Sequence, residues 1–171
     1  MKFHVGMREI KSLAALALSF VIWQLIRLAL PMIETHPIFA YIYSVVELRE
    51  TAEKTRKFGR LRIKATFIGL IVGLIYITIL ILVSSRIGNE TWKLLVEFVL
   101  VLTATLISLL IAEKANCENY CGIAAIIAII CMVSINEEDV YFYALMRAVQ
   151  TLIGVFSAMF INILIKKEDK K

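Results

Sequence analysis

Two arginines begin the same short motif in the two halves of this 171-residue chain. The motif R-x-x-x-T-x-I-G starts at Arg62 and again, 85 positions later, at Arg147. We expect Arg62 to begin a helix at the cytoplasmic side and Arg147 to begin one at the outer side. Basic residues at both mouths, with a net charge of +5, favour an anion that is attracted or gated there. The alternative is that most of this charge only sets the orientation of the chain or meets anionic lipid.

Small residues continue each motif at helical spacing, on the face of the helix that carries the arginine. Such stripes allow helix backbones to approach closely, and Gly-x-x-x-Gly is the tightest version. Helix packing is their ordinary interpretation. The predicted packing stripes are Thr66, Gly69 and Gly73 in the first half, and Thr151, Gly154 and Ala158 in the second.

Four further polar or aromatic residues have two interpretations each. Tyr41 and Tyr43 either belong to an interfacial aromatic belt or line a path for a ring-bearing solute. Asn162 either ties two helices together or contacts substrate. Glu97 either forms an ion pair with Lys93, four residues earlier, or couples transport to protons.

The elements that must position these residues are apolar helices. The chain is 60% hydrophobic with a mean hydropathy of +0.82, which a water-soluble domain of this size does not reach. Four apolar segments are long enough to cross a bilayer and two are short. The long segments are residues 10–33, 65–83, 92–112 and 143–165, and the short ones are 37–48 and 121–135. We expect an all-α integral membrane protein with six transmembrane helices.

Charge predicts the orientation. If all six segments cross and the N-terminus is inside, most of the 19 Lys and Arg residues fall on the cytoplasmic side, including seven in a predicted loop at 49–64. Three helices per half then make the second half enter from the opposite side. We therefore expect one transmembrane domain built as an inverted repeat, residues 1–85 and 86–171, with both termini cytoplasmic.

Several classes of chemistry have no support in the sequence. Cys117, Cys121 and Cys131 lack the further ligands that a metal site needs, so neither a metal nor another cofactor is expected. No catalytic set is present, and an enzyme is not expected. The basic residues flank apolar segments and form no separate face for nucleic acid.

Three stretches resemble the aromatic acid exporter family of the fusaric-acid-resistance-like superfamily. They are GMREIKS at 6–12, GRLRIKATFIGLIVG at 59–73, and SINEEDVYFYALMRAVQTLIG at 134–154 followed by Asn162. The resemblance implies six helices per membrane unit, a bacterial inner membrane, efflux of aromatic or other organic anions, and dimeric or pseudo-dimeric assembly. It carries the family's motif arginines onto Arg8, Arg62 and Arg147, and its glycines onto Gly69 and Gly154. The resemblance thereby implies that Arg8 is a third candidate for attracting or gating the anion.

The predicted function is a secondary transporter that moves organic anions, driven by an ion gradient. A passive anion channel and a non-transporting membrane scaffold are the alternatives. Its predicted partners are membrane lipid, the anion and a second copy of the chain. The homo-oligomer is expected because that family commonly carries a cytoplasmic helical domain after the sixth helix, which the residues up to Lys171 do not include.

Overall fold

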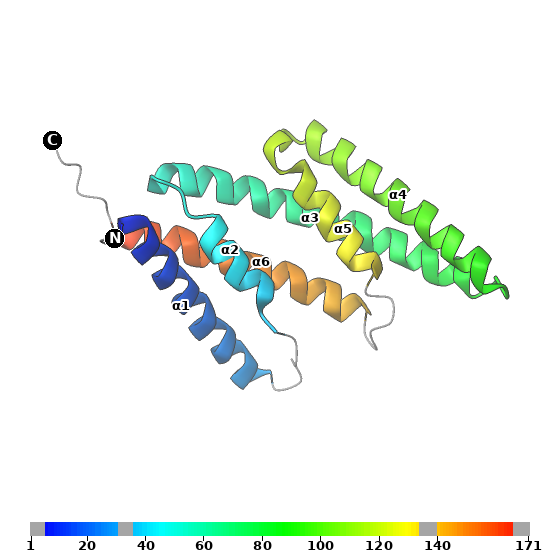
Figure 1. Ribbon diagram of the computed structural model, residues 1–171, viewed down its shortest axis with the longest axis horizontal. Coiled ribbons are helices and arrows are strands. Elements are labelled where there is room, and N and C mark those ends of the chain that lie inside the picture. Colours follow the sequence, from blue (N-terminus) through cyan, green and yellow to red (C-terminus); the bar gives the residue numbers. More distant parts are fainter. Residues whose placement is uncertain (1–5, 31–35, 134–139, 166–171) are drawn as a thin grey trace, which may run out of the picture. The chain divides into compact units, whose positions relative to one another are not determined.

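The computed structural model describes residues 6–30, 36–133 and 140–165. Within these residues it contains six α-helices, one short 3-10 turn and no strand (Figure 1). The prediction of an all-α protein with six helices is confirmed. The helices are α1 (Met7–Ala29), α2 (Ile38–Val46), α3 (Ala52–Ser84), α4 (Glu90–Lys114), α5 (Cys121–Val133) and α6 (Val140–Leu164), and the turn is η1 (Glu118–Tyr120).

Four of the described helices, α1, α3, α4 and α6, are long and apolar enough to cross a membrane. The other two are short, as their sequences predict. At 1.5 Å per residue, the nine residues of α2 span roughly 13 Å and the thirteen of α5 roughly 20 Å, against about 30 Å for a hydrocarbon core. Six complete crossings therefore need a contribution from the segments that flank α2 and α5.

The predicted basic loop at 49–64 is wrong, because α3 already begins at Ala52. Thr51 starts the helix: its hydroxyl accepts a hydrogen bond from the amide of Lys54 at 3.2 Å, as an N-cap residue does. Glu53 adds a negative charge in the first turn, where the helix dipole favours it. The sequence from 52 to 64 is polar but made largely of good helix formers, and polarity alone suggested a loop.

The chain divides into two compact units, and α3 and α6 each contribute to both. Unit 1 is Met1–Ile63 with Val149–Lys171, and unit 2 is Lys64–Ala148. Each unit therefore combines one long helix and one short helix with a part of α3 and a part of α6. The predicted halves, 1–85 and 86–171, both supply residues to each unit.

In unit 1 the short helix α2 lies against α1 and against the second part of α6. Gly154 makes the contact with α6 close: a Cβ there would lie 2.6 Å from the carbonyl oxygen of Ala40. Gly59 of α3 is similarly close to α6, because a Cβ there would lie 2.9 Å from a methyl group of Val155. Only residues without a side chain allow these backbones to approach so far.

In unit 2 the short helix α5 lies against α4 and against the second part of α3. A Cβ on Gly69 would overlap the carbonyl oxygen of Ala124, and one on Gly73 would lie 2.7 Å from the Cβ of Cys131. Leu70 and Cys131 share a buried apolar cluster with Ala144 of α6. Small residues thus bring α3 and α5 together here as they bring α6 and α2 together in unit 1.

The link from α4 to α5 is a tight helix ending. Asn116 adopts a positive φ of 58°, and the amide of Cys117 donates to the carbonyl of Ala112 at 2.9 Å. This is the Schellman arrangement that terminates many helices. Lys64 of α3 donates to the carbonyl of Ala115 at 2.7 Å and so satisfies one of the free carbonyls at the end of α4.

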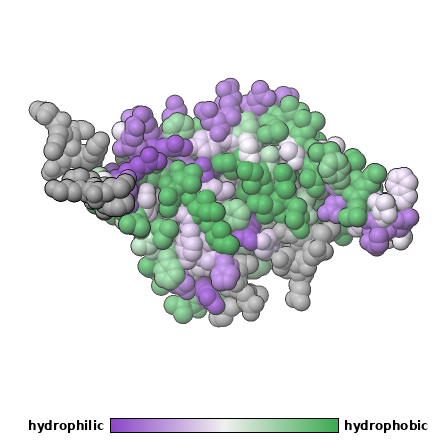
Figure 2. All heavy atoms as spheres, in the orientation of Figure 1, coloured by the Kyte–Doolittle hydropathy of each residue, from purple (hydrophilic) through white to green (hydrophobic). Residues whose placement is uncertain are grey.

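Much of the surface is apolar, as a bilayer requires. Figure 2 shows apolar residues in green across the visible face, with hydrophilic residues in purple mostly toward its margins. Of the four long helices, α4 is the most exposed: only 11% of its most apolar stretch of 18 residues is buried. Its exposed residues include Trp92, Leu94, Leu95, Phe98, Val99, Leu102 and Leu106. Exposing an apolar surface of this size to water is unfavourable, whereas contact with lipid tails suits it.

Candidate functional site

Arg62 is a buried arginine of unit 1, with 5% of its surface exposed. Its Nε lies 2.5 Å from Oε2 of Glu47, whose side chain is fully buried. The guanidinium carbon lies 4.6 Å from the centre of the Tyr43 ring. A charged pair this far from water requires close partners for both charges. Arg62 therefore has both an anionic partner and an aromatic face within the protein.

The short helix α2 provides both partners of Arg62. Tyr43 and Glu47 are four residues apart and so lie on the same face of α2 and its C-cap. Glu47 is the C-cap residue, and its amide donates to the carbonyl of Tyr43 at 3.1 Å. Because Gly154 lets α6 approach the backbone of α2, the position of Tyr43 is fixed by contacts on more than one side.

A second set of buried polar residues joins three helices of unit 1. Lys11 of α1 donates to Oδ1 of Asn162 in α6 at 2.8 Å. The side-chain nitrogen Nδ2 of Asn162 donates to the hydroxyl of Thr55 in α3 at 2.7 Å and to the backbone carbonyl of Arg49 at 3.0 Å. Lys11 and Asn162 are 4% and 2% exposed. Asn162 therefore ties helices together, which was one of its two predicted roles.

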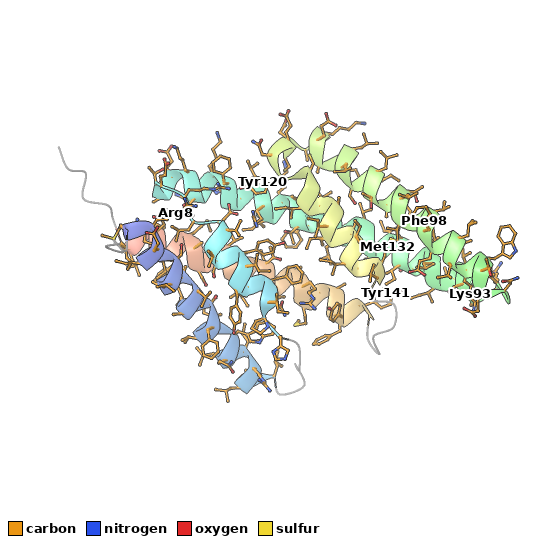
Figure 3. All side chains as sticks on the ribbon, viewed as in Figure 1. Arg8, Lys93, Phe98, Tyr120, Met132 and Tyr141 are labelled. Atoms are coloured by element: carbon orange, nitrogen blue, oxygen red, sulfur yellow. The ribbon has the colours of Figure 1, made fainter. Side chains whose placement is uncertain are left out.

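Arg8 lies apart from these buried groups, at the start of α1 (Figure 3). It is exposed and lines a cavity of about 250 Å³ together with Lys11, Arg49 and Glu50. It also lines a neighbouring cavity of about 310 Å³ with Arg49, Glu50 and Lys54. Basic residues outnumber acidic ones around both spaces, so both favour an anionic group.

Arg147 of unit 2 is half-buried and stacks on a tyrosine of its own helix. Its guanidinium carbon lies 4.4 Å from the centre of the Tyr143 ring, and its Nη2 donates to the Tyr143 hydroxyl. The two motif arginines thus share an aromatic contact. Arg62 has in addition its ion pair with Glu47.

The remaining candidates lie elsewhere. Tyr41 is half-buried on α2, with its ring centre 6.4 Å from that of Phe20. Lys93, labelled near the start of α4 in Figure 3, pairs with Glu90 at 2.8 Å, whereas the sequence suggested Glu97 as its partner. The described residues contain no group of three or more His, Cys, Asp or Glu that could hold a metal.

The packing stripes are all at buried positions. Thr66 and Gly69 are buried in α3, and Thr151, Gly154 and Ala158 are buried in α6. Gly73 lies against Ala128 and Cys131 of α5.

Sequence reasoning missed Glu47, Lys11 and Thr55, which hold the buried polar groups of unit 1. A signal for Glu47 was present, since it is a single carboxylate that directly follows the apolar segment of α2. A carboxylate there requires a cation, and Arg62 is one of the nearby choices. Lys11 and Thr55 have no comparable signal, because they lie in polar stretches whose side chains usually face water.

Comparison with known proteins agrees with the membrane architecture. The sequence model of the family described as fusaric acid resistance protein-like matches residues 13–161, which is most of the chain. No curated protein and no solved structure matches it. The matched range includes Arg62, Glu47 and Arg147, and it excludes Arg8 and Lys11. The expected superfamily is confirmed: the chain is a multi-pass membrane protein of the fusaric acid resistance protein-like family, whose members are typically transporters and not enzymes.

Proposed function

We propose that this protein transports organic anions, aromatic carboxylates among them, across a bacterial inner membrane, with both termini in the cytoplasm. The observation that carries the proposal is the buried Arg62, in ion-pair contact with Glu47 and stacked on Tyr43. Charged side chains inside a membrane protein are expensive and commonly mark ion or substrate paths. The family's typical role in membrane transport supports the same conclusion.

The chemistry around Arg62 suits a carboxylate attached to an aromatic ring. The guanidinium group forms two parallel hydrogen bonds to a carboxylate. Tyr43 offers a ring face beside it, and Tyr41 lies on the same short helix. Arg147 with Tyr143 presents the same pair of groups in unit 2. In this proposal Arg62 and Arg147 attract the anion, and the tyrosines favour ring-bearing solutes.

The two halves form an inverted repeat in this proposal, and reciprocal contacts support it. Gly69 meets the carbonyl of Ala124, and Gly154, 85 residues later than Gly69, meets the carbonyl of Ala40. In each case a glycine in the third helix of one half packs on the short helix of the other half. Such a reciprocal pattern is expected when two similar three-helix halves are related by a pseudo-two-fold axis.

A second pair of contacts follows the same rule. Gly59 approaches Val155 in unit 1, and Ala144 shares a buried cluster with Leu70 in unit 2. Adding 85 to Gly59 gives Ala144, and subtracting 85 from Val155 gives Leu70. Transporters with inverted repeats bind substrate where broken or short helices meet the repeat interface. Helices α2 and α5 have this character.

Glu47 is the proton-coupling residue in this proposal, in place of Glu97. Protonation of its carboxylate would remove the negative charge that faces Arg62. The anion's carboxylate would then take its place, so that one proton and one anion bind together. A carrier of this kind moves a monovalent anion without net charge. Glu97, by contrast, is half-buried on the lipid-exposed helix α4.

The test is flux of benzoate from liposomes that contain the purified protein. We expect Arg147→Gln to reduce the rate at least about tenfold, the loss expected for one charge-assisted contact. Arg86→Gln is the matched control, since Arg86 is an exposed basic residue just after the end of α3. Equal rates in the wild type and Arg147→Gln would reject an anion path through Arg147.

The same preparation separates the alternatives. A passive channel gives flux that follows the membrane potential and ignores a pH gradient, because about 2.3 kcal/mol per 100 mV acts on each charge that crosses. A Glu47-coupled carrier responds to the pH gradient instead. A scaffold gives no flux above that of empty liposomes, and the proposal is then wrong. Assembly as a dimer is part of the proposal and is measured by the mass of the protein in detergent.

A further inference from the structure

Three cavities of unit 1 meet at Arg8. Two of them, of about 250 and 310 Å³, also contact Arg49 and Glu50 at the link between α2 and α3. The third, of about 470 Å³, extends from Arg8 along α1. Arg8 lines all three, so a single ligand that binds its guanidinium group can extend in both directions.

Charged residues make up most of the lining of the first two cavities, and the basic ones outnumber the acidic ones. Their charged lining consists of Arg8, Lys11, Arg49 and Lys54 on the positive side and Glu9 and Glu50 on the negative side. Glu50 has a partner already, since its carboxylate lies 3.2 Å from Lys54. Lys11 is buried and is held in place by Asn162. A buried, positioned lysine between two arginines suits a phosphate group.

The third cavity is mostly apolar. Beyond Arg8, Glu9 and Ser12, its lining consists of Leu13 and Leu16 on α1 and Val45 on α2. Leu13 is 67% exposed, so this groove opens to the surroundings of the helix. In a membrane those surroundings are lipid tails, and the exposed leucines favour an acyl chain over water.

We propose that this joined polar and apolar space binds one anionic phospholipid of the cytoplasmic leaflet. The phosphate lies between Arg8 and Arg49, and an acyl chain lies along Leu13 and Leu16. A soluble organic anion would fill the polar cavities alone and leave the groove empty. The apolar residues that line the groove, and the Arg8 that it shares with the two basic cavities, therefore favour a lipid, in line with basic pockets that hold lipid headgroups elsewhere. This site is separate from Arg62 and does not depend on the proposed transport.

The test is lipid binding to the purified protein, measured by native mass spectrometry with phosphatidylglycerol. We expect Arg8→Gln to weaken binding of the first lipid about fivefold, and Arg8→Gln with Arg49→Gln about thirtyfold, since each basic residue near a membrane surface contributes about fivefold. Arg56→Gln is the matched control: Arg56 is exposed on the first turns of α3 and lines none of the three cavities. Equal weakening by Arg56→Gln would overturn the site.

Competition distinguishes the possible occupants. Inorganic phosphate and benzoate at millimolar concentration should leave the bound lipid in place, whereas displacement by either would identify a soluble-anion site. Phosphatidylcholine should bind at least about fivefold more weakly than phosphatidylglycerol, because it has no net charge. Equal binding of the two lipids would show that charge has no role and would reject the proposal.

A wild-type measurement covers the case in which a variant does not fold. Phosphatidylglycerol with a photoreactive acyl chain should label the peptide that contains Leu13 and Leu16 in preference to peptides of α4, although α4 exposes more apolar surface. Labelling in proportion to exposed apolar surface would indicate general lipid contact and would overturn the site.

Discussion

The two units use the same helix packing but differ in what they bury. In unit 2, α5 meets α3 through small and apolar residues such as Gly69, Gly73 and Ala124. In unit 1, α2 meets α6 in the same way through Gly154, but the unit also buries the Arg62–Glu47 pair and the hydrogen bonds of Asn162. Close packing is therefore common to both units, whereas the buried ion pair and the Asn162 hydrogen bonds lie in unit 1.

The difference separates two kinds of position. Residues that recur in both halves, such as Gly69 and Gly154, define the architecture that both halves need. Residues without a polar counterpart mark what one unit does alone. An example is Asn162, because the matching position 85 residues earlier is the buried apolar residue Ile77. Four predictions test this contrast between the two units.

The largest effect is expected for Glu47→Gln in unit 1. It leaves the buried Arg62 charge without its anionic partner and should destabilise the protein by about 3–5 kcal/mol, measured by thermal unfolding in detergent. Adding Arg62→Gln should recover part of the loss, because a pair removed together leaves no unpaired charge. An unfolding temperature that is unchanged in Glu47→Gln would show that the pair contributes nothing.

Next in size are Gly69→Ala and Gly154→Ala, which test the packing that the units share. Each new Cβ meets a backbone carbonyl that cannot rotate away, so each should cost about 3 kcal/mol of unfolding free energy. The control is Gly122→Ala in α5, where a Cβ meets nothing within 4 Å and helix propensity predicts a gain of up to about 1 kcal/mol. A large loss in one unit alone would contradict the shared architecture.

Asn162→Leu should have an intermediate effect. It removes the hydrogen-bond partner of Lys11 and of Thr55 while keeping the number and branching of the side-chain heavy atoms, and should cost about 2 kcal/mol. Ile77→Val at the matching position of the other half is the control, with an expected loss of about 1 kcal/mol. Equal small losses in both variants would mean that the Asn162 hydrogen bonds add no stability.

The smallest effect is expected for Lys93→Gln in unit 2. Its pair with Glu90 is solvent-exposed, so removing it should change the unfolding free energy by no more than about 0.5 kcal/mol. Benzoate flux should also be unchanged. A strong loss of flux would place a functional charge on α4 and remove the contrast between the two units.

The sequence predicts most of the fold because hydropathy reports directly on helices in lipid. The segments at 65–83 and 92–112 fall inside α3 and α4, and the short segment at 121–135 overlaps α5. The beginning of α3 was missed because a charged amphipathic helix has the composition of a loop. The run from Lys54 to Lys64 is rich in charged residues, and its hydropathy therefore does not indicate a helix.

The candidate site was only partly predictable. Arg62 stands out because it repeats at Arg147, but its partner Glu47 lies 15 residues earlier on another helix, and a single sequence does not show which acid and base will meet. The ties between Lys11, Thr55 and Asn162 join positions more than 100 residues apart in the chain. Such contacts follow from the packing of the helices, which spacing along one helix does not contain.

The point at which charge ends in α3 has a physical consequence for the membrane itself. After Lys64, the helix continues to Ser84 without a charged residue, and these twenty residues measure about 30 Å. That length equals the hydrocarbon thickness of an ordinary bilayer, which predicts that exposed basic residues before it, such as Lys57 and Arg60, lie near the lipid phosphates and fix the depth of the helix. We therefore expect reconstituted protein to be most stable in lipids of ordinary acyl length, and to tilt or deform thinner bilayers.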